Sequence, residues 1–199
     1  MRRLLGTIAL LALVPGVALA ASSEAWRTHR AATTRLSVDA PSSWIDVTRL
    51  SPQVLAHAQE VPALRQYVEL AKTSKIVKLI VADVGARTVA SHFATSLNVV
   101  QAPTIGDLRL QRDATLAQLR SSGLLTSPVR STAVTLPAGR AVELRYRARY
   151  GAGNPEVAQL QYLFVAGGKG TVLTYTTLPR LEAAYGPVFL RSARSLRFA

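Results

Sequence analysis

The last third of the chain is a succession of short segments rich in β-branched and aromatic residues, and this succession constrains the fold more than any other feature. Turn residues separate the segments, at Pro137-Ala138-Gly139, at 151–155 and at 167–170. Connections this short join antiparallel neighbours, because a parallel pair needs a crossover of a dozen or more residues. The sequence therefore predicts an antiparallel meander of strands over residues 129–136, 140–150, 156–166 and 171–178.

The first turn of this meander also predicts a register between the two strands that it joins. Pro137 suits the second position of a type I turn, and Gly139 suits the left-handed position that follows in a three-residue loop. The loop then decides which residues face each other: Val134 with Val142, Thr132 with Leu144, and Ser131 with Arg145.

The chain before the meander mixes strand and helix patterns. Short β-type segments are predicted at 36–40, 44–47, 76–84 and 93–100. Apolar residues at helical spacing predict helices over 61–72 and 104–122, and Gly123 fits the end of the second. A last helix is predicted from Pro179, followed by a short closing strand at 196–198.

Composition and length complete the prediction of the fold class. With 49% hydrophobic and 18% charged residues the chain is typical of a globular protein, and its length suits one domain. The elements together predict an α+β fold, with helices packed on the faces of a predominantly antiparallel sheet. The rings of Trp44, Tyr67 and Tyr185 are expected in the core.

The first twenty residues have the pattern of a secretory signal peptide. Arg2 and Arg3 precede an apolar run that closes on Ala18-Leu19-Ala20, and small residues there are typical of a cleavage site. An uncleaved anchor is the alternative, since the run is near the lower length limit for a membrane span. Residues 21–33 are small and polar and are expected to be a flexible tether, which leaves 34–199 as the single folded domain. The protein is therefore expected to be exported, to the periplasm or the exterior.

The chain is strongly basic, with a formal net charge of +13. Removal of residues 1–20 takes away two Arg and no acidic residue, which leaves +11. Such a charge favours association with an acidic envelope protein or with an anionic surface, including peripheral contact with a membrane. Few aromatic residues are available to stack on bases, so no specific nucleic-acid partner is expected.

Most catalytic and metal-binding patterns are missing from the sequence. The absence of Cys excludes disulfides, thiolate metal sites and a cysteine nucleophile. No two of His29, His57 and His92 have the spacing of a helical metal site, so they are expected to be surface or loop residues. Asp39 and Asp46 flank Trp44, but carboxylates without further partners are weak evidence for acid–base chemistry. No catalytic residue, cofactor or metal site is predicted.

Two glycine-rich segments resemble nucleotide-binding motifs but lack essential positions. In the segment Gly167-Gly168-Lys169-Gly170-Thr171 the residue at 163 is Leu where a phosphate-binding loop needs Gly, so a hairpin turn is predicted. The segment Gly151-Ala152-Gly153 has Glu156 where a dinucleotide-binding motif needs its last Gly.

One strand carries the feature that points most directly to a binding role. The two-residue period of a strand places Glu143, Arg145, Arg147 and Arg149 on one face and apolar residues on the other. These four residues are the predicted partner-binding site, in which guanidinium groups would meet an acidic partner. The alternative is an ordinary solvated sheet face on which Glu143 pairs with Arg145 or another neighbour.

Several of these segments, in the same order, resemble the PsbP-like superfamily. They are Leu36–Pro41 with Trp44, Phe93–Val100, Leu136–Ala141, Gln161-Tyr162, Thr171–Thr177 and Ser195–Phe198. The superfamily includes the extrinsic protein of photosystem II, a Ran-binding import factor and exported bacterial proteins of the LpqN type. The resemblance implies an α/β/α sandwich built on an antiparallel sheet. It also implies a role in protein binding or assembly, because the superfamily shares no catalytic constellation.

The resemblance and the charge together give an expected function. The protein is expected to be a non-enzymatic binding or assembly module of the bacterial envelope, acting as a protein–protein adaptor. Two alternatives remain at this stage: a carrier of a small apolar ligand, and an electrostatic binder of anionic envelope surfaces. The sequence decides neither the identity of the partner nor the oligomeric state.

Overall fold

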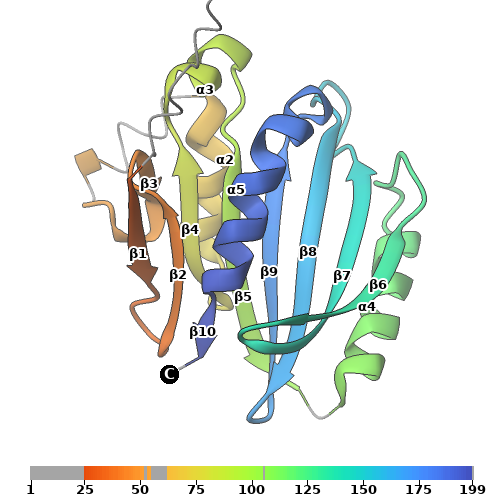
Figure 1. Cartoon of the computed structure of the whole chain (residues 1–199). Helices are drawn as coiled ribbons and strands as arrows, with labels where there is room; N and C mark the ends of the chain where they lie inside the picture. The colour runs from red at the N-terminus through yellow and green to blue at the C-terminus, as the bar shows by residue number, and fades with distance from the viewer. Residues whose placement is uncertain (1–24, 52, 55–61, 105, 199) are drawn as a thin grey trace, which may run out of the picture.

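A seven-stranded antiparallel sheet runs through the middle of the molecule (Figure 1), in the order β3-β4-β5-β9-β8-β7-β6. The structure is a computed structural model, and it describes residues 25–51, 53–54, 62–104 and 106–198. The predicted signal peptide (1–20) and His57 lie outside the described residues. The strands of this sheet are β3 (Trp44–Asp46), β4 (Val77–Asp83), β5 (Ser96–Pro103), β6 (Arg130–Leu136), β7 (Gly139–Ala148), β8 (Val157–Ala166) and β9 (Lys169–Thr177).

A second, three-stranded sheet corrects the predicted domain boundary. Its strands are β1 (Trp26–Arg30), β2 (Leu36–Pro41) and β10 (Arg197–Phe198), in the order β1-β2-β10. Residues 26–30 are part of the predicted flexible tether (21–33), yet each of them pairs with a residue of β2. The folded domain therefore begins before residue 34. The error arose because a strand that pairs at a sheet edge needs little apolar sequence of its own.

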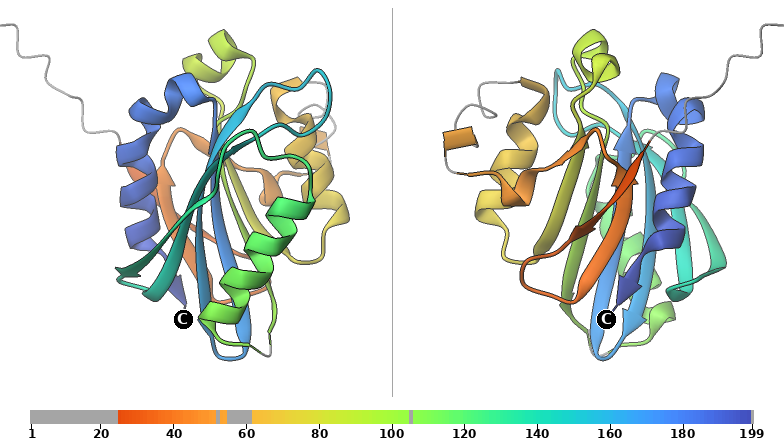
Figure 2. Two further views of the ribbon diagram at one scale, coloured as in Figure 1. Left: turned by 90° about the vertical axis from the view of Figure 1, so that its right-hand side faces the viewer. Right: turned by 60° about the vertical axis from the view of Figure 1, so that its left-hand side comes forward.

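Helices cover both faces of the large sheet (Figure 2). The helix α5 (Glu182–Ser195) and the small sheet lie on one face, and α2 (Pro62–Thr73) and α4 (Leu108–Ser121) lie on the other. The remaining helical segments are α3 (Ala86–Ser91) and the 3-10 turns η1 (Val47–Arg49) and η2 (Pro179–Leu181). The predicted α+β class, an antiparallel sheet with helices on its faces, is confirmed.

The hydrophobic core follows this layering. The largest cluster lies between the sheet and α5, where Phe189 stacks on Tyr175 with ring centroids 4.7 Å apart. Two smaller clusters lie on the opposite face, one beneath α2 and one beneath α4. The predicted core rings of Trp44, Tyr67 and Tyr185 are all buried.

The helix α4 forms where the sequence predicts a helix, with a later start. The side chain of Asp107 accepts a hydrogen bond from the Leu110 backbone N–H at 2.8 Å, which satisfies one donor of the first turn. Gly123 adopts a left-handed φ of +68° directly after the last turn, as expected for a helix end. No residue of α4 is buried, and the helix packs on β7 and β8 through the partly buried Leu108, Leu116 and Leu119.

Candidate functional site

The strand β7 places three of the four predicted site residues on one face of the large sheet. Glu143, Arg145 and Arg147 all point toward the side that α5 occupies, because their partners on β8 are Tyr162, Leu160 and Ala158, in that order. Arg149 lies beyond the end of the strand, and its backbone N–H donates to the Leu124 carbonyl at 2.8 Å. Arg149 is therefore not one of the strand residues, and its place in the predicted site stays a prediction.

The register between β6 and β7 differs by one residue from the predicted register. The chain reverses across Pro137 and Ala138 alone, and Gly139, with a φ of +125°, already pairs with Leu136. A shift of one residue moves each side chain of β6 to the opposite face. Arg145 therefore faces another cation, Arg130, and not the small Ser131, and Glu143 faces Thr132.

The arginines of this face are partly neutralised by neighbouring carboxylates. Arg145 Nε donates to Glu143 Oε1 at 2.6 Å, and this hydrogen bond is the main reason that the pKa of Arg145 is raised. Arg147 Nη1 lies 3.9 Å from Glu156 Oε2, a longer and weaker pair. The pairing of Glu143 with Arg145, which the alternative interpretation expected, is therefore present. About half of each arginine side chain is nevertheless exposed, 49% for Arg145 and 48% for Arg147.

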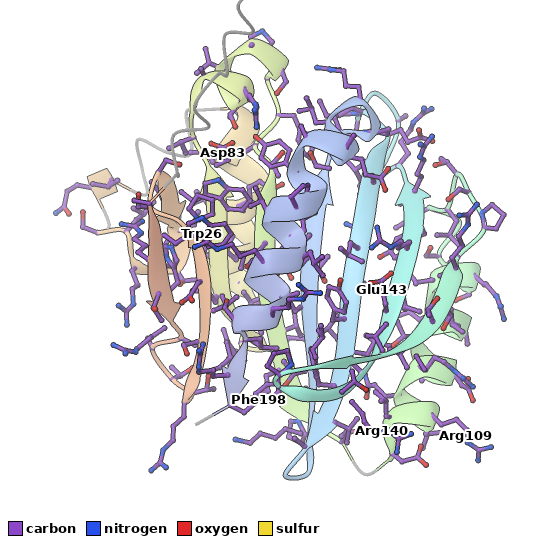
Figure 3. All side chains as sticks on the ribbon, viewed as in Figure 1. Trp26, Asp83, Arg109, Arg140, Glu143 and Phe198 are labelled. Atoms are coloured by element: carbon purple, nitrogen blue, oxygen red, sulfur yellow. The ribbon has the colours of Figure 1, made fainter. Side chains whose placement is uncertain are left out.

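This part of the sheet has no helix over it. The helix α5 contacts β2 and β9, and β7 and β6 extend past it in the view of Figure 1. Figure 3 labels Glu143 on this open part of the sheet, to the right of α5 and beyond β9. We name the α5-side surface made by Arg130, Thr132, Glu143, Arg145 and Arg147 the Arg face.

A small hollow adjoins the Arg face beside the first turns of α5. It has a volume of about 180 Å³, and its lining includes Arg145, Leu160, Glu182, Phe189 and Leu190. Leu160 and Phe189 are buried beneath it, whereas Leu190 is 40% exposed. The Arg face therefore combines guanidinium donors with an apolar depression, a combination that sequence periodicity alone could not reveal.

His29 is buried, which corrects the expectation that the histidines lie on the surface or in loops. Its side chain is 4% exposed in β1, and its Nε2 accepts a hydrogen bond from Arg27 Nε at 3.2 Å. Because Nε2 accepts, the ring is neutral in this arrangement. Burial, and after it the positive charge of Arg27, lowers the pKa of His29 below its ordinary value of 6.5.

We expect the free energy of unfolding to fall as the pH drops below 6.5, the ordinary pKa of histidine. Below that pH the unfolded chain protonates His29 while the folded chain keeps it neutral, so the unfolded state binds more protons. Urea unfolding between about pH 5 and 8 measures this dependence. The variant His29→Gln should lack this contribution and show a shallower dependence on pH. An identical dependence in the variant and the wild type would contradict the assignment.

The two carboxylates that flank Trp44 have structural partners. Asp39 Oδ1 accepts from Thr28 Oγ1 at 2.7 Å, which joins β1 to β2. Asp46 Oδ1 accepts from the Thr48 backbone N–H at 3.0 Å and so caps the first 3-10 turn. Both groups are therefore engaged in holding the local fold.

A third carboxylate, Asp83, fastens α5 to the large sheet. Its Oδ2 accepts a hydrogen bond from the Tyr185 hydroxyl, and its Oδ1 accepts from the Gly85 backbone N–H at 2.8 Å. Burial, and next the hydrogen bond to Asp83, raises the pKa of Tyr185 to about 12. The guanidinium of Arg87 lies 5.4 Å from the centroid of the Tyr185 ring. Asp83 is labelled at the upper end of α5 in Figure 3.

The variant Tyr185→Phe is expected to lower the free energy of unfolding by about 1–3 kcal/mol, because it leaves a buried carboxylate oxygen without its donor. A double-mutant cycle with Asp83→Asn, followed by urea unfolding, measures the coupling between the two side chains. Strictly additive effects of the two substitutions would contradict a direct interaction.

The glycine-rich segment at 167–170 is part of a hairpin, as predicted. Gly167 and Gly168 have φ values of +55° and +70°, and the turn they form joins β8 to β9. Positive φ at both central positions is typical of the turns that suit a two-residue hairpin, which explains the two glycines.

Neither a metal site nor a membrane-spanning helix is found in the part of the chain that the structure describes. Within it, no three His, Asp or Glu side chains lie close enough together to hold a metal ion. None of the helices in the described ranges is long and apolar enough to cross a membrane.

Comparison with known proteins identifies the fold. The sequence matches no protein-family model and no curated protein. The structure is similar to the solution structure of cyanobacterial PsbP (CyanoP) from Synechocystis sp. PCC 6803, with a TM-score of 0.56 and 15% identity. That match covers 95% of this chain and 99% of the other.

A second similar structure is that of LpqN from Mycobacterium tuberculosis, a protein described as involved in cell envelope biogenesis. The TM-score is 0.51 at 12% identity, and the match covers 87% of this chain and 90% of the other. Identities this low show the fold alone. The order and packing of the elements, together with these two matches, show that the chain has the PsbP-like fold.

Proposed function

We propose that the protein is an exported, non-enzymatic binding module that docks an acidic protein of the bacterial envelope on its Arg face. The observation that carries the proposal is the open surface of β6 and β7 beside α5, where Arg145 lines a hollow that also contains Leu160, Phe189 and Leu190. The charged, apolar and small-residue order of residues 1–20 supports export. The involvement of LpqN, a protein of the same fold, in cell envelope biogenesis supports a role in the envelope.

The charges of the Arg face favour an acidic partner. Arg130 and Arg145 are directly opposite each other, and like charges in that position repel. Arg145 donates to Glu143 through Nε, so the two terminal nitrogens of the Arg145 guanidinium remain for another acceptor. A carboxylate from a partner would relieve the repulsion, and the planar guanidinium would bind it through two hydrogen bonds.

The hollow beside the first turns of α5 supplies the apolar part of the proposed interface. Protein interfaces take most of their affinity from a few side chains that fill desolvated pockets, with arginine enriched around them. An apolar side chain of the partner would contact Leu160, Phe189 and Leu190 there. Arg145 lines the same hollow and would bind a neighbouring carboxylate of the partner.

The proposal is tested by capturing partners from an envelope extract and then measuring affinity with the purified partner. The test variant carries Arg145→Glu and Arg147→Glu. The matched control carries Arg112→Glu and Arg120→Glu, which make the same change of charge on α4 across the sheet. Capture is compared at about 50 mM and about 200 mM salt, because screening weakens surface attraction.

The expected result is one specific protein, retained by the wild type and the control at both salt concentrations. The test variant should bind that protein at least about tenfold more weakly, which corresponds to about 1.4 kcal/mol. Equal weakening by the control would show a general electrostatic binder of anionic surfaces instead. If the wild type retains no protein at the higher salt concentration, the adaptor proposal is wrong.

A further inference from the structure

An open cleft lies at the end of the sheet near β10, where the β6–β7 turn, the start of α4 and the end of β8 meet. Its volume is about 570 Å³, within the range of small-molecule sites. A second hollow of about 330 Å³ adjoins it, and Leu108, Arg109 and Arg140 line both. Figure 3 shows Arg109, Arg140 and Phe198 along this end of the molecule. The cleft shares no residue with the Arg face.

The charges around the cleft select the charge of a ligand. Arg109 and Arg140 come from different elements, are both exposed, and form no ion pair among the described residues. Asp107 also lines the cleft, where its Oδ1 accepts from the Leu110 backbone N–H as the helix cap. Two guanidinium groups and one carboxylate leave a single excess positive charge. A ligand with one negative charge would balance this excess.

The rest of the lining selects an apolar body for that ligand. The rings of Phe164 and Phe198 lie edge to face with centroids 5.5 Å apart, and Phe198 is only partly buried. Ala138, Gly139 and Ala166 have little or no side chain, so the cleft stays open beside these rings. An inorganic anion would leave this apolar surface in contact with water, whereas an organic anion would cover it.

We infer that this cleft binds a singly charged oxyanion carried on a small apolar body, with Arg109 and Arg140 holding the oxyanion and Phe198 contacting the body. The ligand is either a free organic acid or the head and first carbons of an anionic lipid, since both present this chemistry. The partly charged first turn of α4 adds to the attraction. The inference does not depend on the Arg face.

Octanoate is the probe for a free acid, and its binding is followed by the chemical shifts of backbone amides. Saturable shifts are expected at Gly139, Arg140, Ala166 and Phe198. Acetate has the same charge without the chain, and octyl glucoside below its critical micelle concentration has the chain without the charge. Each should bind at least about tenfold more weakly than octanoate, because acetate lacks the apolar chain and octyl glucoside lacks the negative charge.

Variants separate this site from general attraction to a basic protein. The pair Arg109→Gln and Arg140→Gln should weaken octanoate binding at least about tenfold. The unfolding temperature should stay unchanged, since neither residue forms an ion pair with any residue that the structure describes. Arg120→Gln, at the other end of the same helix, should bind octanoate as the wild type does. The variant with Arg145→Glu and Arg147→Glu should also bind normally, which separates this site from the proposed docking face.

Vesicles of phosphatidylglycerol, compared with vesicles of phosphatidylcholine, distinguish the two sources of the ligand. Sedimentation with phosphatidylglycerol that requires Arg109 and Arg140, and that octanoate inhibits, assigns the ligand to a lipid. Octanoate binding without vesicle binding assigns it to a free acid. The inference is overturned if octanoate produces no saturable shifts, or if the Arg109 and Arg140 substitutions leave its binding unchanged.

Discussion

Replacing Phe189 with alanine is expected to lower the free energy of unfolding by about 3–5 kcal/mol. The ring is 3% exposed and lies between two other rings of the main core, 4.7 Å from the centroid of Tyr175 and 5.8 Å from that of Tyr185. Its removal would leave a cavity between α5 and β9 that these neighbours cannot fill without moving. A loss of this size is a large share of the roughly 5–15 kcal/mol that stabilises a domain.

Urea unfolding of Phe189→Ala beside Leu190→Ala measures this effect with an internal control. Leu190 is the next residue on α5 but is 40% exposed, so its truncation should cost less than half as much. Equal losses from the two variants would contradict the packing of α5 described here. Leu190→Ala should also weaken binding at the Arg face, because its side chain lines the hollow there.

Removal of residues 25–33 is expected to destabilise the domain by about 3–5 kcal/mol, from lost hydrogen bonds and one lost cation–π contact. The five residues of β1 all pair with β2, and the Arg27 guanidinium donates to the Trp44 carbonyl. The guanidinium of Arg191 lies 4.1 Å from the centroid of the Trp26 ring, which joins β1 to α5. Deletion would also expose the long edge of β2.

The measurement is a comparison of urea midpoints between chains that begin at residues 25 and 34. A point variant, Trp26→Ala, separates the ring contact from strand pairing and should cost only about 1 kcal/mol. If the chains that begin at 25 and at 34 unfold at the same urea concentration, β1 is dispensable. Residues 25–33 would then behave as the flexible tether that the sequence predicts.

Local sequence patterns predicted the meander well, and the reason is that its information is local. Residues 129–178 alternate with the period of a strand and are interrupted by glycine and proline turns, so strand positions and antiparallel order follow directly. The exact register did not follow. Pro137-Ala138-Gly139 is compatible with a two-residue or a three-residue loop, and the structure has the two-residue loop.

The small sheet could not be predicted because its pairing is non-local. Residues 26–30 pair with β2, and β2 in turn pairs with the last strand of the chain. His29 is buried because this small sheet forms, and the residues next to it in the sequence give no sign of its burial. A short polar segment that gains its structure from distant partners has the same sequence signature as a linker.

Part of the Arg face was predictable for the same reason that the meander was. The period of two places Glu143, Arg145 and Arg147 together whatever surrounds them. The contribution of Arg130 depends on the register, and the hollow beside Leu190 depends on where α5 crosses the sheet. Arg109 and Arg140 line the same cleft because of where α4 packs on the sheet, and sequence spacing does not encode that position.

The most direct test of the proposed function is to ask which face of the sheet touches the partner in the cell. A photo-crosslinking amino acid is placed at Thr132 on the Arg face and, in a separate chain, at Gln118 on α4. Both positions are exposed, so the substitutions should not disturb the fold. The proposal predicts a crosslinked protein from position 132 alone, lost when Arg145 and Arg147 become glutamate. A crosslinked protein from position 118, with none from 132, would contradict it.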